Sequence, residues 1–154
     1  MTDAARVATD LNETLARLES ALLTPVVSGE LASWANTVQE ATEQLSQRLP
    51  GYLKTVLHPQ YAEIAKSDPE LLTRIEQLIA EDQNVVLEQE AFRSQLSDFV
   101  KRTAEVQKDE VRLAADRAKL EQDGIALVLR VKRQRVAADT WLAEATYRDR
   151  GPGD

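Results

Sequence analysis

Apolar residues recur along most of the chain at the spacing of amphipathic helices. Over residues 2–23 they alternate spacings of four and three, which places them on one helix face. They are Ala4, Ala8, Leu11, Leu15, Leu18 and Leu22. Pro25 should end this first helix, because proline has no N–H to continue the hydrogen-bond ladder. Ser28 is a favourable N-cap, so it predicts the start of a second helix.

The second helix should have two interruptions. Its inward residues are Leu31, Trp34, Val38, Leu45, Leu49 and Tyr52. Pro50-Gly51 predicts a kink or a short break, with more helix as far as Leu57. His58-Pro59 then predicts a corner of the chain.

Residues 67–70 carry the clearest helix start. Ser67 or Asp68 can cap a third helix, Pro69 suits its first turn, and Glu70 completes a capping-box spacing. No Gly or Pro occurs between Pro69 and Gly124, so the end of this helix is poorly marked. We place the boundary with a fourth helix in the polar stretch 101–110. The alternative is one coiled-coil helix from 69 to about 147.

The fourth helix should present an inner series that includes one glycine. The series is Leu113, Leu120, Gly124, Leu127, Val131, Gln134, Ala138, Trp141 and Ala145. No alternating pattern indicates a strand. The sequence therefore predicts an all-α fold, an antiparallel up-down-up-down four-helix bundle with long third and fourth helices (C and D). We expect one domain over residues 1–150 and a flexible tail at 151–154.

Composition limits both the chemistry and the cellular location that we expect. The chain has no cysteine, which excludes disulfides, thiolate zinc sites and a cysteine nucleophile. No apolar segment follows the first residues, and the longest aliphatic run, 125–129, is far too short to span a bilayer. We therefore expect a soluble, cytoplasmic protein that makes no contact with a membrane.

Charge is distributed unevenly. Residues 1–100 hold 7 basic and 16 acidic side chains, a net of −9, whereas residues 101–154 hold 12 and 10, a net of +2. An acidic surface repels phosphate backbones, so nucleic-acid binding is not favoured. The candidate basic surface, typical of a solvated helix face, is Arg130, Lys132, Arg133 and Arg135.

Candidate catalytic groups are scarce. His58 is the single histidine, it falls at the expected corner, and we expect it on the surface. No Glu-x-x-His occurs, no base lies near a candidate serine, and no Gly-rich phosphate loop is present. The sequence therefore predicts a protein that is not an enzyme and has no cofactor and no metal site.

Three segments together resemble the middle of a hemerythrin-like bundle. They are residues 49–59, 68–71 and 78–82. The resemblance covers roughly residues 4–148 and implies a four-helix bundle that, in the family, holds a di-iron centre. In that family the second helix offers a His and, four residues later, a Glu. Leu49 and Leu53 stand at those positions.

The other ligand positions are also altered. Asp82 stands where the third helix would offer His, after a matching Glu81, and Gln134 stands where the fourth would offer His. Asp139, five residues on, matches the family's Asp. The resemblance therefore implies the fold together with loss of metal binding. Asp82, Gln134 and Asp139 become candidate relic polar positions of the core, which can form a pocket, specify helix register or reach solvent.

Three functions remain open. The first is a non-catalytic bundle that acts through protein–protein interaction, with an unknown protein partner or by self-association. Exposed apolar seams on long third and fourth helices would support it. The second is a metal- or oxygen-binding hemerythrin-like protein. The third is binding of an anionic surface or nucleic acid through the basic stretch of the fourth helix.

Overall fold

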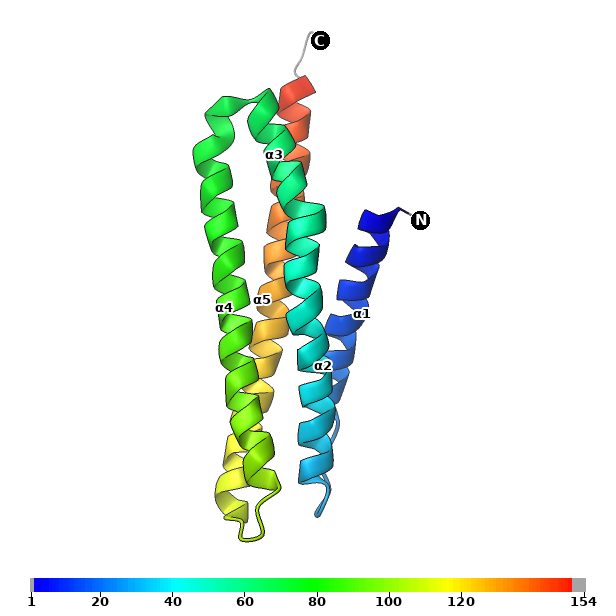
Figure 1. The fold of residues 1–154 in the computed structure, drawn as a ribbon, viewed down its shortest axis with the longest axis vertical. Helices are drawn as coiled ribbons and strands as arrows, with labels where there is room; N and C mark the ends of the chain where they lie inside the picture. Colours follow the sequence, from blue (N-terminus) through cyan, green and yellow to red (C-terminus); the bar gives the residue numbers. More distant parts are fainter. Residues whose placement is uncertain (1, 151–154) are drawn as a thin grey trace.

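The computed structural model describes residues 2–150, and within that range four long helical rods and their short connections account for the chain (Figure 1). The all-α class is confirmed. The predicted tail 151–154 lies outside the described residues. The first rod is α1 (Asp3–Leu23), and the second is α2 (Leu31–Tyr52), η1 (Leu53–Leu57) and α3 (His58–Ser67) in series. After η2 (Pro69–Leu71) come α4 (Leu72–Thr103) and α5 (Glu110–Arg150).

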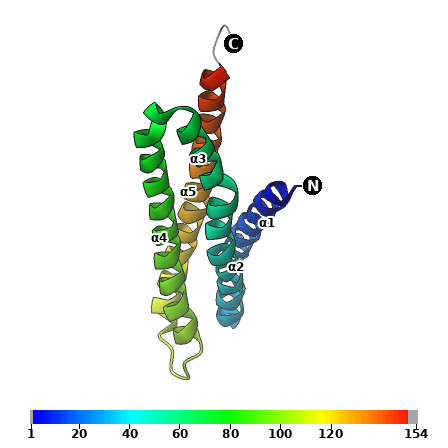
Figure 2. The ribbon, with the colours of Figure 1, turned by 45° about the horizontal axis from the view of Figure 1, so that its top comes forward.

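The first helix matches its prediction. The hydroxyl of Thr2 accepts a hydrogen bond from the amide of Ala5 at 3.2 Å, which satisfies one of the unpaired amides of the first turn. Figures 1 and 2 show α1 beside α2, stopping well short of the end at which α3 lies. At that end α3, α4 and α5 pack together without α1.

The second helix starts later than predicted. It begins at Leu31 with Glu30 at the N-cap position, whereas Ser28 stays in the connection from α1. Gly29 has φ of +85°, a left-handed conformation that side-chain-bearing residues rarely adopt. This turn moves the N-cap position by two residues, from Ser28 to Glu30.

The predicted break at Pro50-Gly51 and corner at His58-Pro59 are both wrong. The helix continues through Pro50 and widens into a π-helical turn, η1. The amide of His58 bonds to the carbonyl of Leu53, five residues back, instead of four. This wider turn comes directly before Pro59, so a residue without an N–H is accommodated and the rod continues as α3.

The sharp reversal lies at residues 68–71. Asp68 accepts a backbone hydrogen bond from Leu71 at 3.0 Å, and α4 follows the 3₁₀ turn that Pro69 begins. The helix starts where we predicted it. No side-chain capping bond forms at this start, so the predicted capping box is not present here. The polar stretch 101–110 contains the boundary, since α4 ends at Thr103 and α5 begins at Glu110. A single helix from 69 to 147 is wrong.

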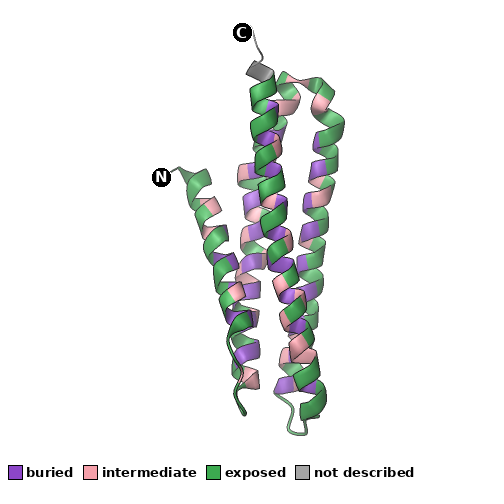
Figure 3. Ribbon diagram, turned by 180° about the vertical axis from the view of Figure 1, so that it is seen from behind, coloured by how far each residue is buried: buried purple, intermediate pink, exposed green. Residues whose placement is uncertain are grey.

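The core runs along the inward faces of all four rods (Figure 3). Gly124 of α5 allows a close approach: a Cβ there would lie 2.7 Å from both terminal methyls of Leu22 and 3.0 Å from Phe92. Leu142 is buried in place of Trp141, which is only partly buried. Among the described helices, none has a stretch long and apolar enough to cross a bilayer.

Candidate functional site

A buried polar cluster interrupts the hydrocarbon core where α3, α4 and α5 meet. Asp82 of α4 is fully buried. Gln134 of α5 donates from Nε2 to its Oδ1 at 3.0 Å, and His58 Nε2 lies 3.3 Å from its Oδ2. Each carboxylate oxygen therefore has one partner, which offsets much of the cost of burying the group.

The π-helical turn explains why His58 joins the cluster. A π turn adds one residue to a helix, so it rotates everything that follows it relative to the preceding face. Directly after this turn, His58 faces Asp82 and stacks on Tyr61, with ring centroids 5.9 Å apart. We predicted an exposed corner residue, and this is wrong: the His58 side chain is about one-third exposed (32%) and touches the core.

Burial dominates the ionisation of the cluster. Desolvation raises the pKa of Asp82, against hydrogen bonds from Gln134 and His58 that lower it. Desolvation also raises the pKa of Tyr61, and the nearby Asp82 charge raises it further. The hydroxyl of Tyr61 is buried without a hydrogen-bond partner among the described residues. The cluster therefore favours neutral groups, with Asp82 as its one carboxylate.

Two cations, Arg130 and Arg135, border this region. Arg130 donates to Oε1 of Gln134 at 3.4 Å. Arg135 lies over the ring of Tyr52, 4.8 Å from its centroid, and donates to the side chain of Asn12 on α1. Burial raises the pKa of Tyr52, although Arg135 lowers it. Arg135 thus connects α5 to both α1 and α2 beside the cluster.

Hydrocarbon fills the remaining space around Asp82. Leu49 and Leu53 are buried there, and the inward seam predicted this for Leu49. The cavity that they share with Asp82 and Gln134 holds only about 10 Å³, at the lower limit for one water molecule. Over residues 2–150, no three His, Asp or Glu side chains are arranged to hold a metal ion. The geometry supports a structural polar contact rather than a substrate site.

The predicted relic positions are only partly assembled. Asp82 and Gln134 meet, but Asp139 is exposed, away from both. Glu81 also faces outward, where it pairs with Arg74 at 3.7 Å. The two carboxylates that matched the hemerythrin-like pattern therefore do not point into the core.

The basic stretch of α5 is spread around the helix and largely neutralised. Arg130 pairs with Glu88 at 3.5 Å, and Lys132 pairs with Glu19 at 2.9 Å. Arg133 is exposed. These side chains point toward different neighbouring helices, so they do not form one continuous cationic surface.

A second apolar seam follows the outward face of α5, and our sequence reasoning missed it. Its members again alternate spacings of four and three, with one step of four added, and we call it the outer seam. It consists of Val111, Ala115, Ala118, Gln122, Ile125, Leu129, Arg133, Val136, Thr140, Ala143 and Tyr147. Val136 is 66% exposed and Tyr147 is 83% exposed. The signal was present in the sequence, but the inner series was taken as the whole apolar content of this helix.

Figure 3 shows exposed positions along α5 on the side opposite the buried ones. At 100° per residue, the outer seam lies about 180° from the inner series around Gln134 and Ala138. Two opposite apolar faces on one helix are typical of a helix that packs on both sides.

Comparison of the chain with models of known protein families, with characterised proteins and with solved structures gives no match.

Proposed function

We propose that this chain is a non-catalytic helical-bundle protein that acts through protein–protein interaction, with the outer seam of α5 as its contact surface. The observation that carries the proposal is the second apolar face of α5. A helix on the surface of a bundle needs one apolar face, and the opposite face is ordinarily polar. Here that face exposes Leu129, Val136 and Tyr147.

The shape of the seam indicates a helical partner. From Val111 to Tyr147 it extends about 54 Å at 1.5 Å per residue. Alternating steps of four and three match the seam by which one helix packs along another. Gln122, Arg133 and Thr140 are its polar members, of which Arg133 alone is charged, and polar residues in such a seam can fix the alignment of two helices.

Self-association is the simplest form of this interaction. A second copy offers an identical seam, and a two-fold axis through the middle of α5 would pair the two seams with each other. The partner is therefore, in our proposal, another copy of this chain, in the cytoplasm and with no cofactor.

We also propose that the fold is an antiparallel up-down-up-down bundle with long α4 and α5, descended from a hemerythrin-like ancestor that has lost its di-iron site. Two features support the loss of that site. Leu49 and Leu53 fill the space where ligands would stand, and Asp82 and Gln134 contact each other across the core. Metal analysis of the purified protein, with a visible absorption spectrum, tests the loss: stoichiometric iron or manganese would refute it.

Sedimentation velocity over a range of protein concentrations tests the interaction. We expect a dimer that becomes monomeric in the double variant Leu129→Glu, Val136→Glu, because two buried carboxylates per seam would be desolvated. The control is Leu87→Glu, which changes a leucine on the outer face of α4 that is as exposed as Val136. It should sediment as the wild type does. A wild-type protein that stays monomeric at every concentration would refute the proposal.

The basic stretch supports a competing function less well, because two of its cations are paired with carboxylates of neighbouring helices. Polyanion binding would have to depend strongly on salt and be abolished by Arg133→Glu. Titration of the protein with a duplex at two salt concentrations distinguishes this function from the first.

A further inference from the structure

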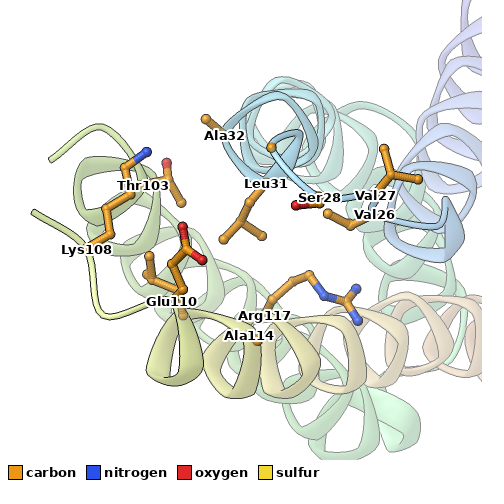
Figure 4. Close-up of a pocket in the computed structure, with 12 residues that line it drawn as sticks. Val26, Val27, Ser28, Leu31, Ala32, Thr103, Lys108, Glu110, Ala114 and Arg117 are labelled. Carbon is orange, nitrogen blue, oxygen red and sulfur yellow. The ribbon is translucent and has the colours of Figure 1, made fainter. Parts of the chain in front are cut away.

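A cavity of about 280 Å³ lies at the end of the bundle where two connections meet. The α1–α2 connection and the start of α2 form one wall, and the end of α4 with the first turns of α5 forms the other (Figure 4). At about 30 Å³ per water molecule, it has room for roughly nine waters or one small organic molecule. It lies far along the bundle from the buried polar cluster.

Six of the twelve residues that line this cavity are apolar, and Ser28 and Thr103 add hydroxyl groups. Leu31 of α2 points into it from one side (Figure 4), and Leu113 lies in the first turns of α5. The remaining apolar lining comes from Val26, Val27, Ala32 and Ala114. Such a surface favours an aliphatic or aromatic group over a free phosphate or a sugar.

Arg117 supplies a fixed positive charge to this cavity. Its guanidinium carbon lies 5.5 Å from the ring centroid of Trp34, a buried side chain that in turn packs edge-on against Phe99 at 6.1 Å. The cation–π contact holds the guanidinium in place before any ligand arrives. Only 25% of the Arg117 side chain is exposed, so its charge acts in a partly desolvated site.

The donors of Arg117 are largely unused. Its one ion pair, with Glu121 at 3.6 Å, is longer than a hydrogen bond. Within residues 2–150, no side chain or carbonyl accepts a hydrogen bond from this guanidinium, although it has five N–H donors. A carboxylate is the group that such a planar fork binds best, through two parallel hydrogen bonds.

The other charged groups of the cavity offset each other. Figure 4 shows Lys108 and Glu110 on the side away from the guanidinium of Arg117. One is a cation and the other an anion, so the lining carries a net charge of +1. Glu121 is outside the lining but pairs with Arg117 at 3.6 Å, so a ligand carboxylate would have to replace it as the partner of the guanidinium.

We propose that this cavity binds a small monocarboxylate with an apolar body. The carboxylate pairs with Arg117, and the body lies against Leu31 and Leu113. This site is separate from the outer seam, so its test is independent of the test of self-association.

Proton–nitrogen NMR correlation spectra of the full chain, titrated with 3-phenylpropanoate, test the proposal. We expect saturable shifts of the Trp34 indole and Gly29 amide signals and none of the Trp141 indole signal, which Trp141→Phe assigns. The uncharged analogue 3-phenylpropanamide should bind roughly tenfold to a hundredfold more weakly, because it loses the charge-assisted pair. Absence of saturable shifts, or equal binding of the amide, would overturn the proposal.

Three variants locate the site. Arg117→Gln should weaken the binding of 3-phenylpropanoate by the same factor, roughly tenfold to hundredfold. Ala114→Phe should also abolish binding, because it fills the cavity and leaves Arg117 in place. Lys119→Gln is the control: it removes an exposed charge two residues away on α5 and should bind as the wild type does. Wild-type affinity in either of the first two variants, with dispersed spectra, would contradict the assignment.

Discussion

Gln89 of α4 offers the sharpest test of how this bundle is stabilised. Its side chain is fully buried, and neither its amide nitrogen nor its amide oxygen has a hydrogen-bond partner among the described residues. A buried polar group of this kind lowers stability, because it loses its bonds to water and gains none in return. We expect Gln89→Met to make the protein more stable.

The size of the effect follows from the burial. An unsatisfied buried group costs about 1–3 kcal/mol. Methionine is close to glutamine in length and adapts to irregular space, so it removes this cost without leaving a large cavity or overfilling the site. We therefore expect a gain of about 1–3 kcal/mol in the free energy of unfolding, or roughly 2–12 °C in melting temperature for a domain of this size.

Urea unfolding followed by circular dichroism, together with a calorimetric melting temperature, measures the gain. The matched control is Gln83→Met, since Gln83 is an exposed glutamine on the same helix, and its effect should stay within about 0.5 kcal/mol. A Gln89→Met protein that is less stable than the wild type would refute the reasoning. It would mean that the Gln89 amide is satisfied in solution by a partner such as a buried water.

Three further predictions concern other parts of the bundle. Gly124→Ala should lower the free energy of unfolding in urea by about 1–2 kcal/mol, because the added Cβ meets Leu22 and Phe92 too closely. This cost outweighs the roughly 1 kcal/mol that alanine gains in helix propensity. A more stable variant would show that Leu22 moves aside. Since burial raises the pKa of Asp82 from 3.8, the stability that its protonated form provides is complete below about pH 3.8 and is lost as pH rises through the raised folded-state pKa. Asp82→Asn should remove that loss. The free energy of unfolding of the variant minus that of the wild type should therefore be larger at neutral pH than in acid. A difference that does not change with pH would contradict this. Thr2→Ala should cost about 0.5 kcal/mol, the low end for an N-cap, because the first turn of α1 is exposed; amide exchange at residues 5–8 should accelerate, and unaltered exchange would argue against the cap.

Helix boundaries that depend on local chemistry could be read from the sequence. The end of the first helix before Pro25 and the helix start at Pro69 depend on the backbone limits of proline, so both lie where predicted. Pro50 and Pro59 misled us because the cost of a missing N–H depends on what the turn can do around it. At Pro59 the preceding π-helical turn accommodates that loss, and one-dimensional periodicity does not encode such a turn.

The candidate site was only partly predictable for a related reason. Asp82 and Gln134 interrupt inward apolar stripes, so each could be placed in the core, but their contact depends on how far α4 and α5 are shifted along each other. His58 could not be placed, because its direction depends on the π turn that precedes it. Arg117 could not be singled out either, since its cavity is built from connections that are distant in sequence.

The widened turn at Leu53–Leu57 has a consequence for how this chain can change over evolutionary time. Losing one residue from this short segment would let the rod revert to regular α-helix, with no gap in the backbone. The turn holds the one extra residue, so every residue downstream on that rod would keep its direction. The imidazole would stay beside its carboxylate partner, so we expect a single-codon deletion within this turn to be tolerated, whereas the same deletion in the regular helix on either side would rotate all that follows by about 100°.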